Sequence, residues 1–209
     1  HPHEDHFDPE FLISRHIEYA TEQNGRLGLV GSRKTLEAMD AVITRRCDYG
    51  SMLRDSGQHA LGVSVQAAQP FQAMRVGPYT VLPYPANHAP NSEALLYSIS
   101  DGTSTVFYGA DSAVIDDSVW RDAMSRGVAY DLVVLDHTYG IGQPSTDHLA
   151  ALDVAACATM LREQSLLKPN GRVLATHLSH EALAGDTPLD SFAEAHGYEL
   201  AWDGLRIQL

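Results

Sequence analysis

The sequence predicts an α/β protein with a sheet-on-sheet core flanked by helices. Helix-like and strand-like segments alternate along the 209 residues, a pattern typical of layered α/β folds. The unbroken apolar run Leu132–Leu135 indicates a buried strand. With 44% hydrophobic residues, the chain can bury a sizeable core, so we expect residues 1–209 to form a single domain.

Five segments have helix signals. Asp8-Pro9 combines a capping side chain with a first-turn proline, and Ser32 is a second cap. The longest helix is expected behind Ser145-Thr146, and the turn residues 168–171 would end it. The expected helices cover residues 8–23, 32–45, 116–126, 147–166 and 189–195.

Strands are expected at short apolar or alternating runs. Asp101-Gly102 lies between two such runs and is a strong hairpin signal, and Asp203-Gly204 predicts a second hairpin at the end of the chain. Residues 47–60 contain Gly50, Asp55 and Gly57 and are expected to be a loop. The expected strands cover residues 27–30, 61–65, 73–84, 95–99, 105–108, 132–135, 172–175, 198–202 and 205–209.

The first six residues form an HxHxDH cluster with four good metal ligands. Imidazole and carboxylate together suit Zn²⁺, Mn²⁺ or Fe²⁺ better than Ca²⁺ or Mg²⁺. Four adjacent ligands are too many for one ion that keeps a position open for water. The spacing suggests two ions, with His1 and His3 reaching one and Asp5 and His6 the other. The simpler interpretations are a histidine-rich tag or a solvated terminal tail, but a tag is usually a run of one residue and does not carry an Asp at a fixed place.

Three further candidates follow short apolar runs, where a strand would end and a loop begin. They are Asn87-His88 after residues 79–84, Asp111 after residues 105–109, and His177 after residues 172–176. Ends of strands are where layered α/β scaffolds hold catalytic groups. Any one of these residues alone would more often be structural, so it is their ordered recurrence behind HxHxDH that indicates a site.

This order of motifs resembles the metallo-β-lactamase superfamily, in which HxHxDH is followed by a His, a bridging Asp and a final His, each after a strand. The resemblance implies an αββα sandwich with two divalent metal ions, zinc or manganese. Carried over residue by residue, one ion would be bound by His1, His3 and His88, the other by Asp5, His6 and His177, and Asp111 would bridge both.

Within that superfamily the sequence is most similar to the PhnP-type cyclic-phosphate phosphodiesterases. The matching segments are Leu82-Pro83 ahead of Asn87-His88, and residues 108–112, 176–180, 197–200 and 203–207. The resemblance implies hydrolysis of a small cyclic or linear phosphodiester by a metal-bridging hydroxide. Several strands precede HxHxDH in the superfamily, so we expect this α/β sandwich to be N-terminally truncated.

A proton donor for the leaving alkoxide is expected beside the metals. His148, in the first turn of helix 147–166, is the candidate, and Asp136 at the end of the buried strand is its expected partner. A carboxylate that holds one imidazole nitrogen fixes the tautomer and raises basicity, as a general acid near neutral pH requires. Superfamily phosphodiesterases pair such residues, so the resemblance supports this dyad. A helix-capping or surface histidine is the alternative.

For other residues near the predicted ligands, the sequence is compatible with more than one role. His180 follows His177 by three residues and could contact the substrate, assist protonation or orient a ligand. His137 neighbours Asp136, but adjacent strand residues face opposite sides of a sheet, so a structural role is expected. Candidates for hydrogen bonds to the ligands are Asn87, Ser112 and Thr176.

Composition narrows the range of partners. The formal net charge of −13 argues against a broad nucleic-acid surface and against the superfamily's RNA-processing members. No apolar run approaches the roughly 20 residues of a membrane span. Two cysteines, Cys47 and Cys157, make no disulfide framework, so a reducing cytoplasm is expected. A small-molecule phosphodiester is the expected partner, and a homodimer is compatible with the sequence.

Two alternative functions stay open. The chain could be another hydrolase on the same scaffold, such as a lactonase or thioesterase, although the pairing of Asp136 with His148 and the segment 176–180 argue against that. It could also be a non-hydrolytic protein that keeps the fold, as some cofactor-biosynthesis relatives do, although the intact ligand set argues against this. One scaffold hosts many reactions, so the fold alone does not select the substrate.

Overall fold

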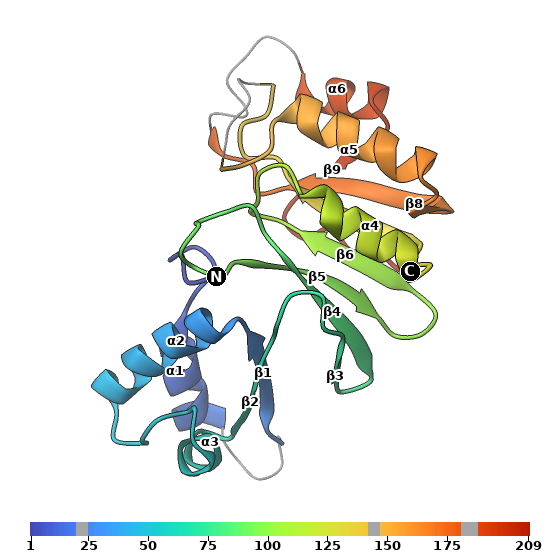
Figure 1. The fold of residues 1–209 in the computed structure, drawn as a ribbon. Coiled ribbons are helices and arrows are strands. Elements are labelled where there is room, and N and C mark those ends of the chain that lie inside the picture. The colour runs from blue at the N-terminus through green and yellow to red at the C-terminus, as the bar shows by residue number, and fades with distance from the viewer. Residues whose placement is uncertain (20–24, 142–146, 181–187) are drawn as a thin grey trace. The chain divides into compact units, whose positions relative to one another are not determined.

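The computed structural model describes residues 1–19, 25–141, 147–180 and 188–209 (Figure 1). The chain divides into two compact units. Unit 1 comprises His1–Gln69 and Pro90–Leu95, and unit 2 comprises Pro70–Ala89 and Leu96–Leu209. The expectation that the chain is a single domain stays a prediction. None of the helices in the described ranges combines the length and the apolar character needed to cross a bilayer.

The described elements of unit 1 are α1 (Pro9–Tyr19), β1 (Leu27–Gly31), α2 (Arg33–Arg46), α3 (Asp55–Leu61) and β2 (Val63–Ala67). The two strands pair in parallel, with Leu27 opposite Val63. The helix α2 begins where the Ser32 side chain accepts a hydrogen bond from the Thr35 N–H, as expected for a cap. The core of the unit is an apolar cluster of Leu12, Leu36, Ile43, Met52, Leu61 and Val63.

Unit 2 is organised around a sheet with the strand order β3-β4-β5-β6-β7-β8-β9. Its elements are β3 (Met74–Val76), β4 (Tyr79–Pro85), β5 (Leu95–Ser100), β6 (Thr105–Gly109), α4 (Asp117–Ser125), β7 (Tyr130–Asp136), α5 (Ala151–Glu163), β8 (Leu167–Thr176), α6 (Leu189–Ala195) and β9 (Glu199–Leu200). The strands β5 and β6 form the predicted antiparallel hairpin, whereas β6, β7, β8 and β9 run parallel to one another.

The main core of unit 2 lies between this sheet and the helices α4 and α5, which pack on the same face of the sheet (Figure 1). Val119 and Trp120 of α4 and Ala158 of α5 belong to one buried cluster with Phe107 of β6 and Val133 of β7. The Phe107 ring lies 4.9 Å from that of Trp120. Burial of this apolar surface holds the parallel strands in a fixed position.

The register of the parallel strands aligns their carboxyl ends. Gly109 of β6 pairs with Leu135 of β7, and Leu135 pairs with Ala175 of β8. The loops that follow these three strands therefore begin at one edge of the sheet, which is where open α/β sheets place ligands.

The structure differs from the expected elements in several places. The helix α3 replaces the second half of the expected loop 47–60 and the first residue of the expected strand 61–65, and Arg54 precedes it without a side-chain cap. Residues 73–84 form two strands, β3 and β4, instead of one. The helix expected from Asp147 begins at Ala151, and residues 168–171 belong to β8. Of the expected terminal hairpin, only β9 is a strand, because it pairs with β8. The expected ends at Gln23 and Ser145-Thr146 lie outside the described residues.

A test of the close packing at the end of β6 is Gly109→Ala. A Cβ at Gly109 would lie 2.6 Å from Cε1 of the buried Phe107 ring, so we expect overpacking to cost about 1–3 kcal/mol of unfolding free energy. Gly28→Ala is the control, because the atom nearest to its Cβ, Ser64 Oγ, would be 3.9 Å away. Chemical denaturation measures both variants, and equal stability of the two would contradict this account of β6.

Candidate metal centre

The predicted residues lie where three parallel strands end. Asp111 follows the last residue of β6 by two positions, Asp136 is the last residue of β7, and His177 follows β8 directly. His88 follows the end of β4 by three positions. The prediction that these candidates follow strands is confirmed.

Two of these residues have an unusual backbone conformation. Asp111 has a φ of 60° and His177 a φ of 63°, in the left-handed region that residues other than glycine rarely adopt. Such strain persists where the surrounding structure enforces it, and it is frequent at functional sites. Both loops therefore hold their side chains in positions that an unstrained turn would not provide.

Four side chains of unit 2 offer a compact set of donor atoms. Asp111, Asp136, His148 and His177 each present one potential ligand atom, and these atoms all lie within 4.8 Å of one another. The side chains of both carboxylates are buried, at 4% exposure for Asp111 and 0% for Asp136. Two buried carboxylates close together repel one another unless positive charge is present. Imidazole and carboxylate donors suit Zn²⁺ or Mn²⁺, so Asp111 and His177 fit a divalent cation, beside which Asp136 and His148 pair with each other.

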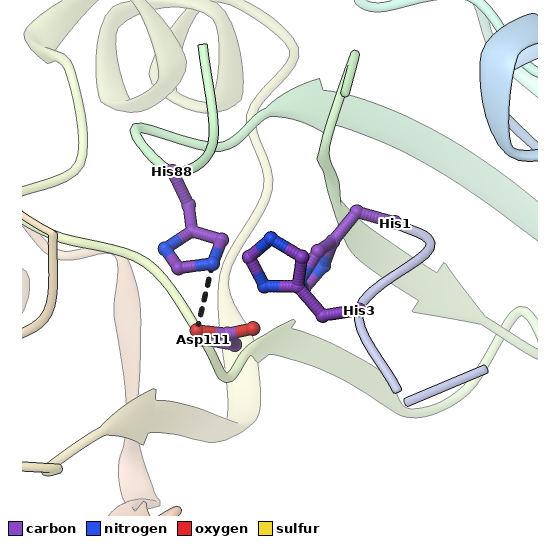
Figure 2. Close-up of side chains that lie close together, drawn as sticks. All are labelled: His1, His3, His88 and Asp111. Atoms are coloured by element: carbon purple, nitrogen blue, oxygen red, sulfur yellow. Dashed lines mark ion pairs between the residues drawn. The ribbon is translucent and has the colours of Figure 1, made fainter. Parts of the chain in front are cut away.

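His88 is oriented toward Asp111. Its Nδ1 lies 3.0 Å from the carbonyl oxygen of Asp147, so Nδ1 carries the hydrogen and donates it. Its Nε2 then faces Oδ1 of Asp111 at 3.4 Å (Figure 2). A histidine whose Nδ1–H is held by a carbonyl presents Nε2 as the metal-binding nitrogen.

The loops that hold His88 and Asp111 are tied to each other. The Asn87 N–H donates to Ser112 Oγ at 3.0 Å, and the Ala113 N–H donates to the carbonyl oxygen of Asn87 at 3.0 Å. Ser112 is fully buried. Asn87 and Ser112 therefore act on the candidate site by fixing these loops. Thr176, the third candidate of this kind, is half-buried at the end of β8.

Asp136 and His148 are in contact, as the sequence predicts. His148 Nδ1 lies 3.0 Å from Asp136 Oδ2, and the Leu149 N–H donates to Asp136 Oδ1 at 3.1 Å. Burial alone would raise the pKa of Asp136, but hydrogen bonds from His177, the Thr138 N–H and His148 outweigh it and lower that pKa. Asp136 is therefore an ionised acceptor for His148. His148 lies in the turn ahead of α5 and not in its first turn.

Two further histidines flank these residues. His137 is fully buried, and its Nε2 lies 2.8 Å from the Tyr198 hydroxyl, which fits the structural role expected for it. His180 is exposed and forms no hydrogen bond or ion pair with any other residue that the structure describes. The structure therefore gives His180 no partner within the described part of the candidate site.

Thr138 also contacts side chains of the candidate site, although the sequence predicts no role for it. Its hydroxyl lies 2.8 Å from His177 Nδ1 and 3.1 Å from His148 Nδ1. The only signal that could have found it is its position two residues after Asp136 at a strand end.

The HxHxDH motif forms a compact turn in unit 1. The His6 N–H donates to the carbonyl oxygen of His3 at 3.0 Å, and the rings of His1 and His3 are in an edge-on contact at 4.3 Å (Figure 2). His6 Nε2 lies 3.3 Å from Asp5 Oδ2. The four motif residues are thus gathered in unit 1, and the ligands at the strand ends are gathered in unit 2. That the two groups bind the same pair of ions stays a prediction.

Several solved structures have a fold similar to that of this chain. The structure is similar to the metallo-β-lactamase fold protein YhfI from Bacillus subtilis, with a TM-score of 0.67, 21% identity, and coverage of 98% of this chain and 74% of that one. Unliganded yeast PDE1 matches with a TM-score of 0.70 and 12% identity over 98% of this chain. Igni18, a metallo hydrolase from Ignicoccus hospitalis, matches with a TM-score of 0.57 and 12% identity over 96% of this chain and 72% of that one.

The chain therefore has the α/β metallo-β-lactamase fold. It spans 65% of the length of yeast PDE1. No protein-family model matches the sequence, and no curated protein matches it.

The charge of Asp136 predicts how stability depends on pH. Because its pKa is lowered in the folded protein, Asp136 stabilises the fold above the ordinary carboxyl pKa of about 3.9, and this contribution is lost as the pH falls through the folded-state pKa. Asp136→Asn should cost about 1–3 kcal/mol of unfolding free energy in the metal-free protein at neutral pH, and the deficit should shrink in acid. Denaturation across pH measures this, with the exposed Asp203→Asn as control. A deficit independent of pH would contradict the assignment.

Proposed function

We propose that the protein is a dinuclear metal-dependent hydrolase that acts on a small cyclic or linear phosphodiester. The observation that supports this most directly is the cluster of Asp111, Asp136, His148 and His177 at the aligned ends of β6, β7 and β8. The metallo-β-lactamase fold and its likeness to a metallo hydrolase support the same class of reaction.

In this proposal the HxHxDH turn and the strand-end residues share two ions of Zn²⁺ or Mn²⁺. The direction of His88 Nε2 toward Asp111 Oδ1 supports Asp111 as the bridging ligand. The contacts among the rings of His1, His3 and His6 support joint metal binding by the residues of the motif. The first ion would be held by His1, His3 and His88, the second by Asp5, His6 and His177, with Asp111 contacting both.

When bound, two such ions would supply an activated hydroxide and would offset charge on the phosphoryl oxygens. The residues of the chain supply the proton. Asp136 accepts a hydrogen bond from His148 Nδ1, so Nε2 is the nitrogen from which His148 would protonate the leaving alkoxide. His180 is the alternative donor.

The overall composition supports a small substrate. A formal net charge of −13 disfavours a long polyanion, whose binding depends on clustered Lys and Arg, whereas two divalent ions attract a small phosphodiester locally. We infer a small-molecule substrate on these grounds.

The proposal is tested by metal content and activity together. The full chain loaded with Mn²⁺ or Zn²⁺ should contain two ions and should hydrolyse bis(p-nitrophenyl) phosphate or a ribose cyclic phosphate in preference to a lactone or a thioester. His3→Ala and His177→Ala should each lower the metal content measured by elemental analysis and reduce hydrolysis of every substrate alike. The exposed His196 provides the control, since His196→Ala should change neither quantity. Two bound ions with hydrolysis of the lactone or thioester alone would exclude the phosphodiesterase.

The role of His148 is tested with leaving groups of different basicity. His148→Ala should leave the metal content unchanged and lower turnover by about 10² to 10⁴. The loss should be smaller for p-nitrophenolate, which needs little protonation, and Asp136→Asn should show a weaker form of the same pattern. An equal loss on good and poor leaving groups would make His148 a substrate-binding residue and shift the acid role to His180.

A further inference from the structure

Thr138 lies between the side chains of Asp136, His148 and His177. It lies two residues beyond Asp136 and is 9% exposed. Its Oγ1 is 3.2 Å from Asp136 Oδ2, 3.1 Å from His148 Nδ1 and 2.8 Å from His177 Nδ1. One hydroxyl group therefore contacts the predicted proton donor, its orienting carboxylate and a predicted metal ligand.

The chemistry of these groups fixes the direction of the hydrogen bonds. A hydroxyl has one hydrogen to donate and two lone pairs, and an ionised carboxylate only accepts. Asp136 accepts hydrogen bonds at Oδ1 from the N–H groups of Thr138 and Leu149, so it is the acceptor of this pair, and the Thr138 hydroxyl donates to Oδ2 at 3.2 Å. The hydroxyl oxygen must then accept from His177 Nδ1, the nearest of its three contacts.

Asp136 also disfavours the other tautomer of His177, in which Nε2 carries the hydrogen. His177 Nδ1 also lies 3.4 Å from Asp136 Oδ2. A bare Nδ1 lone pair would face the negative carboxylate oxygen, whereas an Nδ1–H is attracted to it. The Nδ1–H form places the lone pair of His177 on Nε2, the nitrogen that a metal ion could bind.

The backbone of Thr138 connects the ends of β7 and β8. Its N–H donates to Asp136 Oδ1 at 2.8 Å. Its carbonyl oxygen accepts from the Ser179 N–H at 3.2 Å and from the Ser179 hydroxyl at 2.8 Å. The loop that contains His177 is thus attached to the turn that contains Thr138, which keeps the hydroxyl beside the imidazole.

We propose that Thr138 is a positioning residue of the metal centre: its hydroxyl holds His177 in the Nδ1–H tautomer with Nε2 presented as the ligand, and it orders the carboxylate that orients His148. The metal-binding part rests on the proposed function, whereas the tautomer of His177 does not. Valine matches the shape of threonine but has no hydroxyl, so Thr138→Val leaves Nδ1–H of His177 without its nearest acceptor. Asp136 Oδ2 lies farther from that nitrogen, at 3.4 Å, and so holds the Nδ1–H less firmly than the hydroxyl does.

The test compares Thr138→Val with Thr138→Ser, which keeps the hydroxyl, and with the control Thr105→Val. Thr105 begins β6, at the end of that strand opposite to Asp111, and its hydroxyl donates to Ser100 Oγ at 3.1 Å. The first readout is the tautomer of His177 in the metal-free full chain at alkaline pH, from long-range ¹H–¹⁵N spectra in which His177→Gln identifies the ring signals. The second is the affinity for Zn²⁺ in competition with a chromophoric chelator.

The wild-type protein, Thr138→Ser and Thr105→Val should show His177 as the Nδ1–H form and bind Zn²⁺ alike. Thr138→Val should show a larger share of the Nε2–H form than the wild type and bind Zn²⁺ about 10- to 100-fold more weakly, as loss of a hydrogen bond to a metal ligand typically causes. An unchanged tautomer in Thr138→Val, or an equal change in Thr138→Ser, would overturn the role of the hydroxyl. If Thr138→Val does not fold, Thr138→Ala makes the same comparison.

Failure of the proposed function gives a different result. A wild-type chain that binds no Zn²⁺ excludes the metallohydrolase, and one that binds Zn²⁺ but hydrolyses no phosphodiester excludes the phosphodiesterase. The tautomer comparison in the metal-free chain then still decides whether Thr138 orients His177.

Discussion

The common register of three parallel strands determines where the reactive side chains of unit 2 lie. Gly109, Leu135 and Ala175 are aligned across β6, β7 and β8, so the residues that follow them reach one edge of the sheet. The register is held from one face by the apolar core beneath α4 and α5. A slip of one residue in any of these strands would turn its side chains to the other face and would separate the carboxylates from the imidazoles.

The cluster at this edge places two buried carboxylates close together, which costs free energy. Asp111 and Asp136 are both buried, and burial of an ionised carboxylate is costly unless hydrogen bonds or opposite charges compensate. Hydrogen bonds from His148 and Thr138 satisfy Asp136. A divalent cation beside Asp111 would supply the remaining compensation, which explains why a fold would keep two carboxylates and several imidazoles so close together.

Much of this arrangement could be predicted from the sequence, because strand ends and ordered ligand motifs leave local signals. The positions of Asp111 and His177 follow from the short apolar runs before them, and the contact between Asp136 and His148 follows from the buried strand and the resemblance. Thr138 could not be predicted, since a threonine after a strand has no distinctive pattern and two of its partners, His148 and His177, are distant in the sequence. The helix α3 could not be predicted from the sequence because it has no side-chain cap and contains Gly57, both of which are unfavourable helix signals.

The central claim is that one pair of ions is held jointly by the HxHxDH turn and the strand-end residues. Anomalous X-ray diffraction from crystals of the full chain grown with Mn²⁺ tests it most directly. The account predicts two anomalous peaks about 3.5–4 Å apart on either side of Asp111, one also contacting His3 and His88 and the other His6 and His177. A single peak, or a pair of peaks that only one of the two ligand groups contacts, would contradict it.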